Sequence, residues 1–73
     1  MDEIALPKSL TEQTYDILLN AICAGEFDPG ERLNQDDIAG RLKVSRQPVN
    51  SAISILKADG FVEDTGKRGV VVA

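Results

Sequence analysis

Apolar residues recur at helical spacing in three stretches of the chain, each introduced by a residue suited to cap a helix. The first stretch follows Ser9, with Glu12 completing a capping box, and it stops before a glycine, which predicts a helix from Ser9 to about Ala24. The second follows Asn34 and lasts two turns, and the third starts at Ser45. The predicted buried stripes are Leu10, Thr14, Ile17, Leu18, Ala21 and Ile22 in the first helix, Ile38, Ala39 and Leu42 in the second, and Val49, Ala52, Ile53 and Leu56 in the third.

Short apolar runs at residues 61–64 and 70–72 predict two strands joined by a glycine-bracketed loop. Residues 31–33 form a further short apolar-containing segment that fits an edge strand. The predicted fold class is mainly α with a small β-hairpin, a winged helix-turn-helix of three helices plus a wing. We expect one domain over residues 1–73, with the helix-turn-helix at about 34–57 and the wing at about 61–73.

The turn between the second and third predicted helices contains Lys43 and Val44. A glycine would be the easier residue there, because a tight turn after a helix commonly needs a positive φ. We therefore expect modest backbone strain at Lys43.

The composition excludes several classes of function. The chain has 73 residues, of which 42% are hydrophobic and only three are aromatic, so its core is small and aliphatic. It has one cysteine, Cys23, and no histidine, which excludes an internal disulfide and a zinc site of the usual Cys/His kind. No paired acid in a cleft and no phosphate-cradling glycine loop is evident. We therefore expect no enzyme activity, no metal and no cofactor.

Charge is distributed unevenly along the chain. The net charge is −4, but residues 1–40 carry nine anions and two cations, whereas residues 41–73 carry six cations and three anions. A chain polarised in this way can present one basic face while remaining acidic overall. The sequence shows no secretory start and no apolar run of membrane-spanning length, so we expect a cytoplasmic protein without a membrane partner.

The third predicted helix has a polar face that suits recognition of DNA bases. Once its apolar stripe is assigned, the outward residues are Arg46, Gln47, Asn50, Ser54 and Lys57. Arginine pairs with guanine O6 and N7, and Asn and Gln pair with adenine N6 and N7. The amides at the helix start, together with the Ser45 hydroxyl, suit a phosphate. An ordinary solvated helix face remains the alternative interpretation of these residues taken alone.

The hairpin adds a second candidate contact. Lys67 and Arg68 stand at its predicted tip, directly after the candidate reading helix in sequence. A basic β-tip beside such a helix suits a backbone phosphate or an adjacent minor groove. A solvated turn is the alternative for this segment by itself.

Two long runs resemble the amino-terminal domain of GntR-type transcriptional regulators. They are Gly25-Glu26-Phe27-Asp28-Pro29-Gly30-Glu31-Arg32-Leu33-Asn34 and Ile38-Ala39-Gly40-Arg41-Leu42-Lys43-Val44-Ser45-Arg46-Gln47-Pro48-Val49, followed by Ala58-Asp59-Gly60-Phe61-Val62. The spacing looks most like the subgroup with an all-helical effector domain. The chain departs from the family where Asn50 and Ser51 replace a common Arg-Glu pair, and where Lys43 replaces a frequent glycine, so its operator is expected to differ from those of relatives.

The resemblance implies a dimeric bacterial repressor or activator whose domain reads a palindromic operator in double-stranded DNA. A small-molecule effector would act only through a further, C-terminal domain. The resemblance implies that the residues that contact DNA are Ser45, Arg46, Gln47, Asn50, Gly66, Lys67 and Arg68. Ser54 is a further candidate because it lies on the outward face of the third predicted helix. An alternative is a winged-helix protein-interaction module whose basic face docks an acidic partner, which the net acidity favours.

Overall fold

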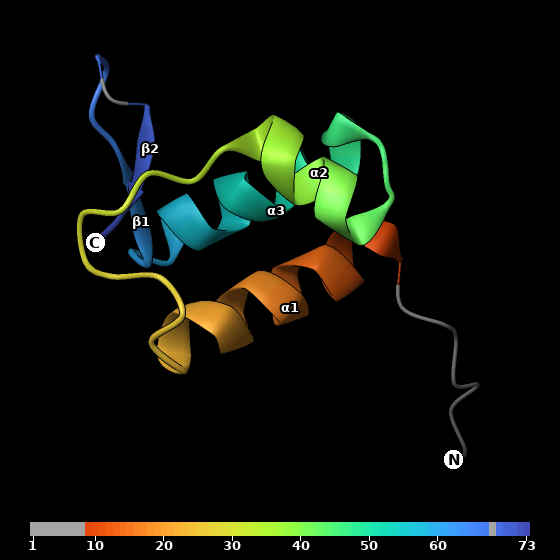
Figure 1. The fold of residues 1–73 in the computed structure, drawn as a ribbon, viewed down its shortest axis with the longest axis horizontal. Coiled ribbons are helices and arrows are strands. Elements are labelled where there is room, and N and C mark those ends of the chain that lie inside the picture. The colour runs from red at the N-terminus through yellow and green to blue at the C-terminus, as the bar shows by residue number, and fades with distance from the viewer. Residues whose placement is uncertain (1–8, 68) are drawn as a thin grey trace.

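In the part of the chain that the structure describes, three helices and a two-stranded antiparallel sheet make up the fold (Figure 1). The computed structural model describes residues 9–67 and 69–73. The elements are α1 (Leu10–Cys23), α2 (Gln35–Leu42), α3 (Arg46–Ala58), β1 (Val62–Asp64) and β2 (Val70–Val72). The predicted order of three helices followed by a hairpin is confirmed.

Each helix begins where the capping residues predict. The Oγ of Ser9 accepts a hydrogen bond from the Glu12 amide at 3.1 Å, and the Oδ1 of Asn34 accepts one from the Asp37 amide at 2.9 Å. These bonds satisfy amides that have no partner within the helix. Ser45 occupies the same position before α3, but its side chain makes no capping hydrogen bond.

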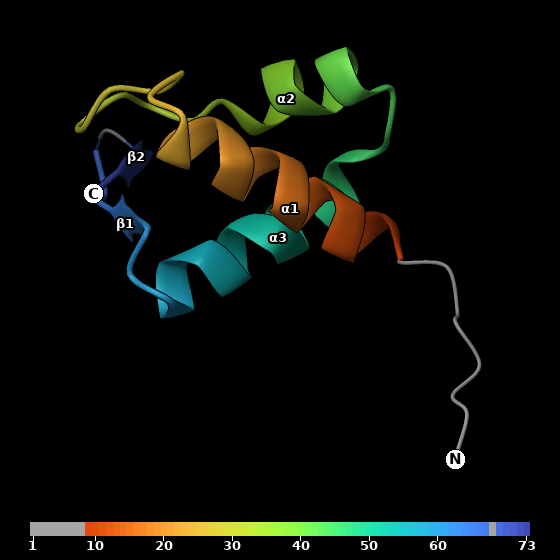
Figure 2. The same ribbon diagram turned by 90° about the horizontal axis from the view of Figure 1, so that it is seen from below.

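The core lies where α1 and α3 pack together and meet α2 and the sheet (Figure 2). The predicted stripe of α3 is confirmed, since Val49, Ala52 and Leu56 are 0% exposed and Ile53 is 3% exposed. Burying one such aliphatic side chain contributes roughly 1.5–3 kcal/mol. The buried side of α3 provides most of the centre of the core, and these contacts fix the orientation of the helix. The opposite side of α3 is exposed to solvent.

The first helix buries a narrower face than the sequence predicted. Thr14 and Leu18 are buried, whereas Leu10 is 55% and Ile17 is 49% exposed. The spacing of apolar residues shows that one side of the helix is buried. It fixes the direction of that side only to within about one residue, which is a rotation of about 100° around the helix axis. The contacts of α1 with α3 turn the Thr14–Leu18 side inward, so the prediction that Leu10 and Ile17 are buried was wrong.

The sheet is anchored to the loop that precedes α2. Val62 pairs with Val72, Glu63 with Val71 and Asp64 with Val70. On the other edge of β2, the predicted strand at residues 31–33 is reduced to a single bridge between Arg32 and Val71. Two bonds flank the bridge, from the Leu33 amide to the Val70 carbonyl at 2.8 Å and from the Val72 amide to the Glu31 carbonyl at 2.9 Å. The wing is therefore fixed to the helical body from both sides of β2.

Candidate nucleic-acid interface

A short turn at residues 43–45 sets α3 against α2. Lys43 caps α2 in the left-handed conformation, with φ of 57°, and it is the one non-glycine residue with positive φ in the part of the chain described. The positive φ expected at this position is confirmed. Ile38 and Ala39 of α2 are buried in the same core as Val49 and Ile53 of α3, so the two helices pack against one another.

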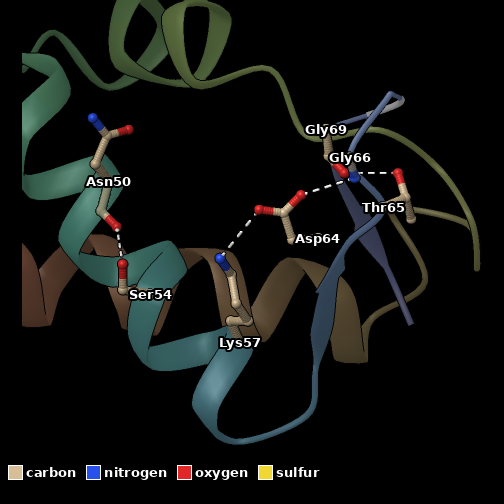
Figure 3. Close-up of polar contacts among 7 residues, drawn as sticks. All are labelled: Asn50, Ser54, Lys57, Asp64, Thr65, Gly66 and Gly69. Carbon is tan, nitrogen blue, oxygen red and sulfur yellow. Dashed lines mark hydrogen bonds and ion pairs between the residues drawn. The ribbon is translucent and has the colours of Figure 1, made fainter.

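The polar face of α3 is open to solvent. Arg46, Gln47, Asn50, Ser54 and Lys57 are all exposed. The side-chain amides of Gln47 and Asn50 have no hydrogen-bond partner among residues 9–67 and 69–73, and the Asn50 amide points away from its helix (Figure 3). The Ser54 hydroxyl donates to the Asn50 backbone carbonyl at 3.1 Å. Two base-reading groups are therefore free, while the hydroxyl of Ser54 is engaged with its own helix.

Arg46 does not project alone from the start of α3. Its Nε lies 2.9 Å from Oδ1 of Asp36 in the first turn of α2. Both side chains remain largely exposed, at 62% for Arg46 and 72% for Asp36. The arginine is therefore accessible, and it is held beside a carboxylate in the first turn of α2.

The far end of α3 is tied to the wing. Nζ of Lys57 lies 3.5 Å from Oδ2 of Asp64 at the end of β1 (Figure 3). The Oδ1 of Asp64 accepts the Gly66 amide hydrogen at 3.0 Å. This backbone hydrogen bond lowers the pKa of the Asp64 carboxyl below its ordinary value of 3.8, and the charge of Lys57 lowers the pKa further by a smaller amount. Lys57 is therefore part of a link between the helix and the wing.

Hydrogen bonds between Thr65 and Gly69 join the two sides of the wing loop. The Thr65 amide and hydroxyl both donate to the Gly69 carbonyl, each at 2.9 Å. Gly66 has a φ of 73°, which a residue with a side chain rarely adopts. Lys67 is exposed and has no ion-pair partner within the described part of the chain. Arg68, the other predicted wing cation, lies outside the described residues.

Ser45 stands exposed at the start of α3. Because its hydroxyl makes no capping bond, both the hydroxyl and the first amides of α3 are left for an external acceptor. Ser45, Arg46, Gln47 and Asn50 are thus brought together on the first two turns of one helix.

Sequence reasoning missed the acidic partners of the basic residues. Asp37 and Arg41 pair at 3.2 Å along α2, a contact that their spacing of four residues would have predicted. The Asp36–Arg46 and Lys57–Asp64 pairs join different elements, so no spacing rule along one helix reveals them.

A groove of about 300 Å³ lies elsewhere, between α1, α2 and the loop that joins them. Its floor includes Ile17, Leu18 and Ile38, and no residue of α3 or of the wing lines it. This volume is at the lower limit for a small-molecule site. In the described residues, no group of three His, Cys, Asp or Glu side chains is arranged to hold a metal ion, and no helix is long and apolar enough to cross a membrane.

A short helix, a tight turn and a second helix with a free polar face, followed by a hairpin, define a winged helix-turn-helix domain. The structure of a DNA-binding domain, AraR(DBD) in complex with operator ORR3, shares this fold with a TM-score of 0.80, at 23% identity over 100% of this chain and 87% of that one.

Two further similarities carry higher sequence identity. The HTH-type transcriptional regulator YdhC of Bacillus subtilis (strain 168) is 35% identical over 71 residues, which is 94% of this chain and 32% of YdhC. A GntR transcriptional regulator from Rhodococcus sp. RHA1 has a TM-score of 0.84 at 43% identity, over 89% of this chain and 31% of that structure. The chain therefore spans about a third of the length of these relatives.

The model of the bacterial regulatory proteins of the gntR family matches residues 10–72. The chain belongs to this family, and it is a winged helix-turn-helix domain of the type that its transcriptional regulators use to bind DNA. The resemblance noted from the sequence is thereby confirmed.

Proposed function

We propose that this domain binds double-stranded DNA in a sequence-specific way, with the first two turns of α3 in the major groove and the wing tip on the backbone or in the adjacent minor groove. The observation that carries the proposal is the exposed face formed by Arg46, Gln47 and Asn50 on a helix whose other side is anchored in the core. A helix fixed in this way can place its polar side chains against DNA bases while its apolar side stays packed in the core.

The roles of the residues follow from their chemistry. Arg46 donates to guanine, while Gln47 and Asn50 pair with adenine or bridge neighbouring bases. The Ser45 hydroxyl and the adjacent amides of α3 hold a phosphate. Ser54 contributes by van der Waals contact or by turning its hydroxyl from the Asn50 carbonyl to a base or phosphate. On the wing, Gly66 permits the tight turn, and Lys67 and Arg68 contact the backbone.

The test begins with selection of bound duplexes from a random oligonucleotide pool. The selected duplex and a scrambled one are then used to measure the affinity of Arg46→Ala. We expect this variant to lose roughly ten- to a hundredfold in affinity for the selected duplex and much less for the scrambled one, because a bidentate arginine–guanine pair accounts for about 1–3 kcal/mol of discrimination.

Arg41→Ala is the matched control, since it removes one exposed cation from α2 outside the proposed reading face. It is expected to change both affinities by the same factor. If Arg46→Ala keeps the preference of the unmodified chain, Arg46 does not read the sequence.

We further propose that the whole protein is a cytoplasmic homodimer that binds a palindromic operator, with no membrane partner. A small-molecule effector acts through an effector domain C-terminal to this one, in the all-helical class. The threefold greater length of the relatives supports the presence of additional sequence in the full regulator. On this account the domain binds DNA and catalyses no reaction, and it acts as a repressor or an activator according to where its operator lies.

The alternative of a protein-interaction module is supported by the net charge of −4. It requires an acidic protein surface to contact the same basic face. The similarity to transcriptional regulators supports DNA as the partner instead.

A further inference from the structure

We propose that Asp36 is a specificity-determining residue, which sharpens the discrimination between DNA sequences by positioning the guanidinium of Arg46 and offsetting its charge. This inference rests on the proposed function, because it concerns the same face of α3. It assigns a role in DNA recognition to a carboxylate, a group that a phosphate backbone repels.

The contact between the two side chains is not needed by the fold. Asp36 and Arg46 lie ten residues apart on different helices, and their charged groups meet at 2.9 Å on an open surface. Ion pairs as exposed as this one add little to stability, since water screens the attraction and the side chains lose freedom. Asp36 is also not required as the cap of α2, because Asn34 already satisfies the Asp37 amide.

The atom that Asp36 approaches leaves the base-reading edge of the arginine free. The carboxylate lies beside Nε, and the N–H groups that form the Nη1 and Nη2 edge point from the planar guanidinium in a different direction. Two hydrogen bonds from such an edge match O6 and N7 of guanine. Because the carboxylate restricts the rotation of the arginine before DNA arrives, less side-chain freedom is lost on binding.

The charge of the pair has a second consequence. Arg46 with Asp36 has no net charge, so the pair attracts phosphates weakly, while its N–H groups still donate hydrogen bonds. Binding to random DNA depends on attraction to phosphates, whereas binding to an operator depends also on base contacts. Specificity is the difference between the binding free energies for the operator and for random DNA. Asp36 lowers the affinity for random DNA and supports the affinity for the operator.

The adjacent residue provides a matched control. Asp37 is exposed on the same turn of α2, and its carboxylate pairs with Arg41 at 3.2 Å. Asp36→Asn and Asp37→Asn change the net charge by the same amount, but only the first separates a carboxylate from the reading arginine. The thermal unfolding midpoint of each variant checks that both remain folded, as their exposure predicts.

The experiment measures affinities for the selected duplex and for a scrambled duplex at one salt concentration. Both variants are expected to bind scrambled DNA more tightly than the unmodified chain. Only Asp36→Asn is expected to lower the ratio of the two affinities, by up to about fivefold, because an exposed ion pair supplies at most about 1 kcal/mol for positioning the arginine. Asp36→Glu retains the carboxylate and is expected to keep the weak binding to scrambled DNA.

The Arg46→Ala background separates the failure of this inference from that of the proposed function. There, adding Asp36→Asn is expected to leave the affinity ratio unchanged, since no arginine remains to be positioned. A ratio that stays the same or rises in Asp36→Asn alone overturns the role of Asp36, even where Arg46→Ala lowers specificity. Absence of any sequence preference in the unmodified chain overturns the proposed function itself.

Discussion

Lys43 holds the left-handed backbone conformation that lets α3 leave α2 at a sharp turn, with φ of 57° and ψ of 44°. A side chain in this region crowds the neighbouring carbonyl, which costs roughly 1–2 kcal/mol. The conformation is kept because the Lys43 amide bonds back to α2 and the Val44 amide bonds to the Ala39 carbonyl at 3.0 Å. The strain is therefore offset by the hydrogen bonds of the turn.

Lys43→Gly is expected to raise the free energy of unfolding by about 0.5–1 kcal/mol, because glycine adopts positive φ without the clash but loses more chain entropy on folding. Urea unfolding measures this change. Lys43→Ala is the control, since it removes the same charge and keeps the clash. Equal stability of the glycine and alanine variants would show that φ at this position does not limit stability.

At the scale of single residues, the sequence predicted the functions of helix caps well and the contacts between helices poorly. Asn34 and Ser9 cap helices as expected, because capping depends on residues three positions apart, whereas Ser45 makes no capping hydrogen bond. The exposure of Ile17 and the pairing of Asp36 with Arg46 depend on how α1 and α2 sit against α3. No local pattern contains that information.

At the scale of elements, Asp64 is the point where α3 and the wing are joined. It binds the Gly66 amide on the wing loop and Lys57 on α3 at the same time. The order of the helices and the strands was predictable from apolar spacing and glycines. The bridge between Arg32 and Val71 was predicted only as an edge strand, since a single ladder contact leaves no pattern of alternation.

The wing link is expected to weaken in acid. Because the folded pKa of Asp64 is lowered, its carboxylate stabilises the link above its ordinary pKa of 3.8, and this contribution is lost as the pH falls through the lower folded value. The NMR chemical shift of the Gly66 amide should therefore change with pH, with a midpoint below 3.8.

Asp64→Asn provides the control for this titration, because the amide still accepts a hydrogen bond but has no charge to lose. Its Gly66 resonance is expected to be independent of pH in that range. A midpoint at or above 3.8 in the unmodified chain would mean that Gly66 and Lys57 do not stabilise the carboxylate.

At the scale of the whole molecule, the acidic half of the sequence does not prevent a DNA-binding face. The net charge is −4, but Arg46, Lys57 and Lys67 lie on α3 and the wing, where Arg68 follows in sequence. Local potential, more than net charge, steers association with a polyanion.

If Lys67 and Arg68 of the wing meet phosphates while Arg46 and Lys57 keep their carboxylate partners, the logarithm of the affinity should fall with the logarithm of salt concentration at a slope of about −1.8. Lys67→Ala removes an unpaired cation from the wing and should reduce the steepness by about 0.9. Fluorescence anisotropy across a salt series measures both slopes. A slope near zero would indicate that phosphates are not the main contact.

The most direct test of the central claim is a titration of the chain with its selected duplex, followed through backbone amide NMR shifts. We expect the shifts to cluster at residues 45–54 and at Lys67 and Arg68, where the exposed polar face of α3 and the wing tip meet DNA. Shifts concentrated instead on α1, or along the groove between α1 and α2, would contradict the assignment of α3 as the reading helix.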